Sequence, residues 1–395
     1  MRKRAAFSAV AIAALFAGLP VLDGSPAPPK RAPNAPETTS AESEKPALVE
    51  KRSAPPGRVV LVVLDGVRWQ DVFLGTDPDL AKTYLLPPSE VVGPEVLVPT
   101  LHRLATRDGL AFGVPGHGEA MFASGPSYVS QPGYIEIFSE RRPLGCATND
   151  CPKTTEPTFV DTIAEATSGD AAVISSWEVV GRAAAVRPER LVVSTGQARG
   201  ENQGELRVDA RATRALEIGR IALPWPGHGE YRPDKFTREI ALAYLEARRP
   251  RFMFLGLGDT DEHAHLGDYR SYLRALHEAD ATIGALLETL ERMGEDGRHT
   301  TVLVTTDHGR EKAFIGHGGH APESSRVWMI AGGNVRPDGP VALSKPAHLF
   351  DVGPTVRELM GLPRSPGEGR ALVDPMHGDP STLSLAQATA EGRAD

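Results

Sequence analysis

Three apolar runs in this 395-residue chain each end at an aspartate. The runs and their acids are 58–64 with Asp65, 252–258 with Asp259, and 301–306 with Asp307. Runs rich in β-branched and apolar residues are typical of buried strands. Ligands of open α/β sheets bind beyond the carboxyl ends of the strands. We therefore expect these acids to lie at one common site.

Histidines accompany these acids. His263 stands four residues after its aspartate, His308 follows Asp307 directly, and His317 lies in a glycine-rich segment together with its alternative, His320. Carboxylate oxygen and imidazole nitrogen are ligands that suit zinc or manganese ions. Six such groups can hold two ions with three ligands each, and a pair of ions can clamp an in-line displacement at phosphorus.

Each of these residues also has an ordinary structural interpretation. Asp65 could cap a helix, and Asp307 alone could begin a polar turn. We interpret Asp261, Glu262 and His265 as solvated or supporting groups rather than as ligands. The combination of three acids at strand ends with Asp-x-x-x-His and Asp-His-Gly spacings is a much stronger signal than any single member.

Ser130 is the candidate nucleophile. Pro132 favours a helix that begins near this serine, and a helix N-terminus provides N–H groups for a phosphate. An ordinary N-cap serine is the structural alternative. Ser124, Ser127 and Ser139 are competing nucleophiles with less support.

The alternation of apolar runs with helical patterns predicts an α/β fold, with a mostly parallel central sheet and helices on both faces. Helices are expected over 235–249, with Asp234 as the cap, and over 268–293. We expect a single catalytic domain over 58–375.

The N-terminal segment predicts export. A basic start and an apolar run to Leu22 are typical of a signal peptide, which we assign to 1–27, or of an uncleaved anchor. Residues 28–57 are expected to be a disordered, Pro/Ala-rich linker and 376–395 a flexible tail. Export to a periplasmic or extracellular compartment favours a small loop disulfide between Cys146 and Cys151.

The composition restricts the partners of the chain. Its net charge of −8 provides no bulk attraction for nucleic acid. Contact with a membrane is expected only through an uncleaved N-terminal anchor. Nothing in the sequence indicates the oligomeric state.

These motifs resemble the alkaline phosphatase superfamily, which includes nucleotide pyrophosphatase/phosphodiesterases, cofactor-independent phosphoglycerate mutases, phosphopentomutases and arylsulfatases. The resemblance covers most of 58–363. The first metal strand matches 61–66, and the Asp-His-Gly element matches 307–309. The central Asp-x-x-x-His pair matches Asp259 and His263, and the last metal histidine matches His317.

The resemblance implies a two-metal enzyme with zinc or manganese as its ions. One ion would be held by Asp259, His263 and His317. The other would be held by Asp65, Asp307 and His308. The family nucleophile falls on Ser130, which implies a covalent phosphoserine and a small phosphate ester as the substrate.

Two positions depart from related patterns. Phosphodiesterase members, the branch that the chain otherwise resembles, have asparagine where this chain has Gly133, and sulfatases have arginine where it has Tyr134. We therefore expect a phosphatase or phosphodiesterase. The alternatives are a sulfatase-like enzyme, a phosphoryl-group transferase, or a non-catalytic metal-binding member. An insertion over 143–229 is expected to shape the substrate pocket near the active site.

Overall fold

The structure is a computed structural model that describes residues 57–373, apart from 198–200, 320 and 365–366. The predicted signal peptide or anchor, the tail, and the linker except Gly57 lie outside the described residues, as does His320.

A central sheet occupies the middle of the described domain. Its strands are β1 Arg58–Leu64, β2 Leu110–Phe112, β4 Ala171–Ser175, β5 Val192–Thr195, β6 Phe252–Leu257, β7 Thr300–Thr305, β9 Met329–Gly333 and β10 Gly339–Pro340. Their order in the described residues is β10-β2-β9-β7-β1-β6-β4-β5, and β9 alone runs antiparallel to both neighbours. The predicted mostly parallel sheet is confirmed. A smaller sheet combines β3 Met121–Phe122, β8 Arg326–Val327 and β11 Ala347–His348.

Helices connect the strands. The α-helices are α1 Trp69–Phe73, α2 Pro78–Thr83, α3 Pro94–Leu97, α4 Pro99–Arg103, α5 Ser130–Ser139, α6 Phe159–Ala166, α7 Val179–Ala184, α8 Ala210–Gly219, α9 Asp234–Arg248, α10 Asp259–His265, α11 Tyr269–Arg292, α12 Glu295–Arg298 and α13 Val352–Leu359. Shorter turns of other helix types are η1 Pro88–Glu90, η2 Leu104–Asp108, η3 Pro188–Arg190, η4 Glu201–Leu206, η5 Pro322–Ser325 and η6 Leu349–Asp351. Both ends of α9 and of α11 lie within one residue of the predicted ranges.

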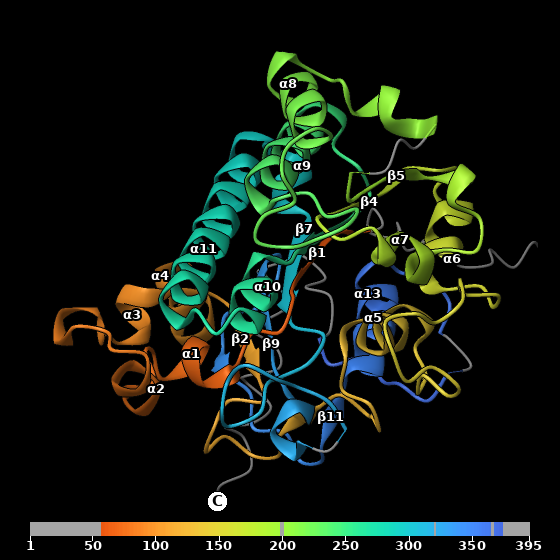
Figure 1. The fold of residues 1–395 in the computed structure, drawn as a ribbon. Coiled ribbons are helices and arrows are strands. Elements are labelled where there is room, and N and C mark those ends of the chain that lie inside the picture. The colour runs from red at the N-terminus through yellow and green to blue at the C-terminus, as the bar shows by residue number, and fades with distance from the viewer. Residues whose placement is uncertain (1–56, 198–200, 320, 365–366, 374–395) are drawn as a thin grey trace, which may run out of the picture. The chain divides into compact units, whose positions relative to one another are not determined.

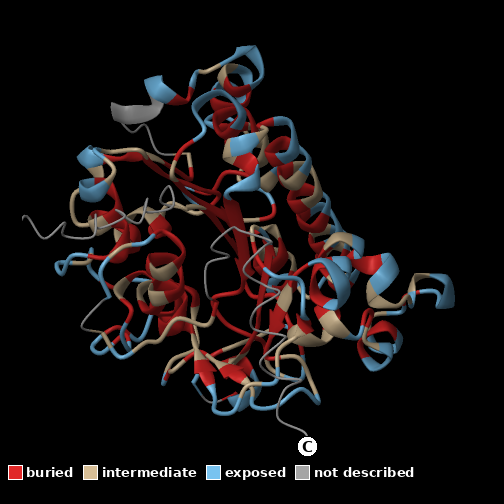
Figure 2. Ribbon diagram, turned by 180° about the vertical axis from the view of Figure 1, so that it is seen from behind, coloured by how far each residue is buried: buried red, intermediate tan, exposed pale blue. Residues whose placement is uncertain are grey.

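Helices cover both faces of the sheet, as Figure 1 shows. Successive side chains of a strand point to opposite faces, so β1 contributes to two cores. Val60 and Val62 belong to the core shared with α9 and α11. Leu61 and Val63 belong to the core shared with α5, α6, α7 and α13. The central strands are accordingly buried on both faces (Figure 2).

The register of the central strands places the C-terminal ends of β1, β6 and β7 side by side. Leu64 of β1 pairs with Leu257 of β6, and Val63 pairs with Thr305 of β7. Because these strands are parallel, the residues that follow them emerge at the same edge of the sheet. No helix of the described residues combines the length and apolarity needed to cross a membrane.

Helix α5 is fixed to its neighbours by a buried ion pair. The Arg357 guanidinium of α13 donates through Nε to Glu140 at 2.7 Å and through Nη2 to Thr162 of α6 at 3.1 Å. Glu140 immediately follows α5, and both members of the pair are buried. This pair ties three helices together beneath one face of the sheet.

Arg357→Met should lower the free energy of unfolding by about 3 kcal/mol, because it leaves the Glu140 carboxylate buried without a cation. Urea unfolding monitored by circular dichroism measures the effect. Arg364→Met is the matched control, because Arg364 is exposed and lies 3.9 Å from Glu358. Equal unfolding midpoints for both variants would contradict this role of the pair.

Candidate active site

The first group of candidate ligands brings together Asp65, Asp307 and His308, as predicted from the sequence. Asp65 follows β1, and the other two residues follow the adjacent strand β7. His308 Nε2 lies 3.5 Å from an oxygen of Asp65 and 3.4 Å from Asp307 Oδ2. All three side chains are buried, and one ligand atom from each fits within the space that a single metal ion requires.

The electrostatics of this group favour a cation. Burial and the nearby Asp261 carboxylate raise the pKa of Asp65 to about 7, and burial and Asp65 raise the pKa of Asp307 well above its usual value. Burial lowers the pKa of His308 to about 4, so its imidazole is neutral at pH 7. Asp307 Oδ2 is buried and has no hydrogen-bond partner among the described residues. A bound cation would offset both the cost of burying the carboxylates and the missing hydrogen bond of Asp307 Oδ2. These residues therefore fit a divalent metal.

The second group consists of Asp261, His265 and His317. His265 Nε2 lies 3.0 Å from Asp261 Oδ2 and 3.0 Å from His317 Nε2. His317 Nδ1 lies 3.0 Å from the carbonyl oxygen of Tyr128, which leaves Nε2 for a ligand. Burial, followed by the proximity of His308, lowers the pKa of His317 to about 3. This group too offers the carboxylate and imidazole donors of a metal site.

The structure brings together a different pair of α10 residues from the pair that we predicted as ligands. Asp261 and His265 stand where we expected Asp259 and His263. All four belong to α10, which begins at Asp259, and both pairs have the Asp-x-x-x-His spacing. Residues two apart on an α-helix point in directions about 200° apart. The pair that faces the site is therefore the one that we had interpreted as solvated or supporting groups.

The predicted pair instead faces a different set of residues. Asp259 Oδ1 accepts hydrogen bonds from the Tyr231 hydroxyl at 2.6 Å and from the Asp234 backbone N–H at 3.2 Å. Burial and the Asp234 carboxylate raise the pKa of Asp259 to about 8. The His263 ring lies edge-on to Trp225, at 6.4 Å between ring centroids.

Asp234 differs from its predicted role as a helix cap. It is the first residue of α9, and its own helix receives no capping bond from its side chain. Its carboxylate instead accepts from the backbone N–H groups of Gly258 and Asp259, each at 2.9 Å. Asp234 thereby fixes the start of α10 and the direction in which this helix presents Asp261.

Arg310, which the sequence did not single out, contacts the second group of candidate ligands. Its guanidinium forms a short contact with Asp261 Oδ1 and also donates to the Phe314 carbonyl at 2.6 Å. Burial alone would raise the pKa of Asp261, but Arg310 and then His265 hold that pKa well below its usual value. Asp261 is therefore an anion at neutral pH. The signal that could have revealed Arg310 is its position directly after the Asp-His-Gly element.

The two groups form one centre. The rings of His308 and His317 stack at 3.9 Å between centroids, with 18° between their planes. Asp261 Oδ1 lies 4.0 Å from the Nε2 atoms of both histidines. Two cations bound to these groups would be close neighbours, as an in-line displacement at phosphorus requires.

Ser130 lies against the first group. Its Oγ is 3.2 Å from Asp65 Oδ1 and 3.1 Å from His308 Nε2. The N-cap of α5 is Val129, and no side chain caps this helix, so the alternative role of Ser130 as an N-cap does not apply. Tyr134, one turn further along α5, donates to the other oxygen of Asp65 at 3.0 Å.

Gly133 explains why α5 can approach so closely. A Cβ atom at this position would overlap the carbonyl oxygen of Asp307 and lie 3.1 Å from its Cβ. Any larger residue, including the asparagine of phosphodiesterase members, would push α5 away from the end of β7. The backbone contact between this turn and Asp307 positions Ser130 beside its neighbours.

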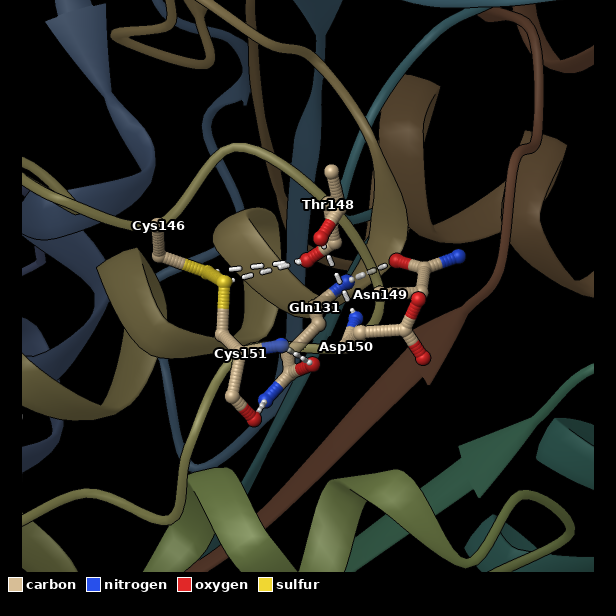
Figure 3. Close-up of a disulfide and its surroundings, with 6 residues drawn as sticks. All are labelled: Gln131, Cys146, Thr148, Asn149, Asp150 and Cys151. Carbon is tan, nitrogen blue, oxygen red and sulfur yellow. Dashed lines mark hydrogen bonds between the residues drawn. A yellow bond between two sulfur atoms is a disulfide. The ribbon is translucent and has the colours of Figure 1, made fainter.

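A disulfide-bonded loop holds the residue after Ser130 (Figure 3). The predicted bond between Cys146 and Cys151 is confirmed. The Gln131 amide side chain donates to the Cys151 carbonyl at 2.9 Å and accepts from the Cys151 N–H at 3.0 Å. The Gln131 backbone N–H donates to Asn149 Oδ1 at 2.9 Å.

These residues open into a cleft of about 610 Å³. Asp65, Ser130, Asn149 and Asp261 are among its lining residues. The predicted insertion over 143–229 supplies much of the remaining lining. Asn149 was not identified from the sequence, because no local motif marks a single asparagine 19 residues after a candidate nucleophile.

Comparisons with known proteins find relatives over part of this chain. Residues 232–364 match the model of the Metalloenzyme superfamily. The phosphopentomutase of Symbiobacterium thermophilum is 30% identical over 165 residues, which make up 40% of this chain and only 39% of that protein. The 2,3-bisphosphoglycerate-independent phosphoglycerate mutase of Cyanothece sp. is 28% identical over 36% of this chain and 27% of its own length.

A solved structure supports the fold. A protein of the alkaline phosphatase superfamily from Vibrio parahaemolyticus aligns with a TM-score of 0.51 at 15% identity, covering 82% of this chain and 71% of that one. The family model and the phosphomutase relatives support the predicted alkaline-phosphatase-like superfamily, and the solved structure shows the corresponding fold. That superfamily consists of metal-dependent enzymes, and the two residue groups described above are candidates for the metal sites.

Asp261→Asn and His265→Ala should each weaken the binding of one ion by at least about 10-fold, because each removes a ligand. Metal titration followed by elemental analysis of dialysed protein measures this loss. Asp259→Asn and His263→Ala are matched controls that should retain both ions. If the two control variants lose an ion while the first two keep it, the assignment of ligands within α10 must be reversed.

Proposed function

We propose that this chain is a two-metal hydrolase of phosphate esters in which Ser130 is the nucleophile. The observation that carries the proposal is the position of Ser130 Oγ, 3.2 Å from Asp65 and 3.1 Å from His308. A serine beside one group of candidate ligands and close to a second matches the needs of phosphoryl transfer better than those of a structural metal site. Oxygen and imidazole donors favour zinc, with manganese as the alternative.

The side chains have separate roles in this scheme. Asp65, Asp307 and His308 would hold one ion, and Asp261, His265 and His317 the other. Two bound ions supply positive charge that activates a nearby hydroxyl and stabilises the charge developing at phosphorus. Tyr134 holds the second oxygen of Asp65, which orients this acid toward Ser130.

The two covalent steps require only the ester and water as reactants. Ser130 Oγ forms a bond to phosphorus while the bond from phosphorus to the ester oxygen breaks, and the departing alcohol takes up one proton in place of the proton lost by serine. Water then attacks the phosphoserine, which releases phosphate and restores the Ser130 hydroxyl.

Asn149 and the N-terminus of α5 would bind the phosphoryl oxygens. Asn149 Oδ1 accepts from the Gln131 N–H, so the Asn149 amide presents its NH₂ group as a donor in the cleft. Donors fixed in advance at the place where negative charge develops are among the largest contributions to catalysis. The asparagine missing at position 133 is thus replaced by one from the disulfide-bonded loop.

A sulfatase is disfavoured by the environment of Tyr134. This residue occupies the position of the sulfatase arginine, and its hydroxyl is engaged with Asp65. The phosphonate monoester hydrolase of Agrobacterium radiobacter, with a TM-score of 0.50 at 13% identity over 82% of this chain and 79% of that one, has the same fold. A putative sulfatase from Bacteroides thetaiotaomicron shares this fold as well, so the preference for phosphate esters rests on Tyr134 and not on the fold.

We propose that the protein works after export. The Cys146–Cys151 disulfide and the apolar run after the basic N-terminal residues both support an oxidising compartment. Small phosphate esters available in the periplasm or outside the cell would be its substrates.

Ser130→Ala should lower the rate of ester hydrolysis by about 10³-fold or more, because water must then replace the nucleophile. The assay measures para-nitrophenol release from phosphate mono-, phosphate di- and sulfate esters by protein loaded with zinc or manganese. Mass spectrometry of quenched wild-type reactions should detect a phosphorylated peptide that contains Ser130. A panel in which only the sulfate ester reacts, or in which Ser130→Ala retains full activity, would overturn the proposal.

The double variant Cys146→Ser/Cys151→Ser should lower kcat/KM by roughly 10- to 100-fold, because Asn149 and Gln131 lose their fixed positions. Metal content should stay unchanged, because none of the candidate ligands lies in this loop. Kinetics and metal analysis on the same sample test both statements. Undiminished kcat/KM would show that the loop does not position the reacting groups.

A further inference from the structure

The cleft extends well beyond the groups that would react. Its volume of about 610 Å³ greatly exceeds the space that a phosphate group fills. We call the part of the cleft that is lined by Asp65, Ser130 and Asp261 the inner cleft. The remainder, the outer cleft, is lined by Asp150, Trp177, Glu178, Trp225, Glu230 and Tyr231 among others. This outer part must contact the organic portion of a substrate.

Aromatic rings supply part of the outer cleft. Trp177 is half-buried, and its backbone pairs in an isolated antiparallel bridge with that of Tyr231, whose own side chain is buried. Trp225 is 62% exposed, although tryptophan is usually largely buried. Its indole makes an edge-to-face contact with the His263 ring and is not packed in a core. Faces of tryptophan attract cations through the negative potential of the ring.

Carboxylates supply another part of the outer cleft. Asp150 and Glu230 have no ion-pair partner within 4 Å among the described residues, and both are exposed. Glu178 lies 3.9 Å from Arg182, the single guanidinium of the cleft lining. Glu262, also in the lining, lies 3.7 Å from His228, so carboxylates still outnumber the cationic side chains of the lining beside the indole rings. Such a surface disfavours a polyanion and attracts a positively charged group.

We propose that the outer cleft binds a cationic amino-alcohol group, so that the preferred substrates are phosphate esters of alcohols bearing a quaternary or primary ammonium. The phosphate would occupy the inner cleft beside Ser130, and the ammonium would lie between the Trp225 indole and the Glu230 carboxylate. This inference rests on the proposed function, because it names the substrate class of the same cleft.

The test compares esters that differ only in charge. Choline phosphate is paired with neohexyl phosphate, in which carbon replaces the quaternary nitrogen, and the para-nitrophenyl diesters of the two alcohols form a second pair. The zinc-loaded full chain should show a kcat/KM for the choline ester about 10-fold above that of its neutral partner in at least one pair. Trp225→Ala and Glu230→Gln should each reduce this ratio to near unity.

Leu144→Ala is the matched control, because Leu144 is 85% exposed but does not line the cleft, and it should keep the wild-type ratio. Equal turnover of the charged and neutral esters by the wild type would overturn the inference, as would a preference that survives in both cleft variants. Faster turnover of a nucleoside triphosphate than of either choline ester would also overturn it. Failure of all esters to react would instead contradict the proposed hydrolase itself.

Discussion

Burial of several carboxylates at the ends of two adjacent parallel strands is the constraint on which the site depends. Asp65 and Asp307 meet there because β1 and β7 run in the same direction and in register. Burial raises the pKa of both acids, and the charge of Asp261 adds to the rise at Asp65 while that of Asp65 adds to the rise at Asp307. Folding of such a group in its charged form is costly unless cations or hydrogen-bond donors compensate. Tyr134 and the Gly66 N–H meet part of this need, and the unpaired Asp307 Oδ2 indicates how much is left for a metal.

Close backbone approach is the second requirement, because Ser130 contacts Asp65 and His308 only if α5 lies directly over them. Gly133 permits this contact with Asp307. Gly66, with φ at +61°, makes the turn after β1, and a Cβ there would overlap the Asp261 carboxylate. These two glycines therefore lie where three elements converge. The buried pair of Glu140 and Arg357 then holds the far end of α5, so that the whole helix keeps its distance from the sheet.

The sequence predicted what depends on periodicity and on strand ends. Long apolar runs located β1, β6 and β7, and so the first group of ligands could be assembled from their last residues. The predicted second group differs from the one that the structure brings together, because the spacing Asp-x-x-x-His fits Asp259 and Asp261 equally well. Only the exact start of α10 decides which face of the helix meets the site, and Asp234, 24 residues before Gly258, sets that start. Asn149 was missed because its position depends on tertiary contacts with Gln131 that leave no pattern in the chain.

The residues that could be predicted from the sequence and those that could not also differ in their chemical roles. The strand ends and the turns after them supply groups that would act on the phosphoryl group shared by many phosphate esters. These groups lie at the edge of the rigid sheet. The insertion over 143–229 supplies Asn149, Trp177 and Trp225, which lie on loops between the sheet elements. Loops can change in sequence without disturbing the packed strands. The preferred substrate can therefore change while the geometry of the groups at the strand ends stays the same. The disulfide between Cys146 and Cys151 makes one of these loops rigid where it approaches Ser130, which is where a loop can least tolerate motion.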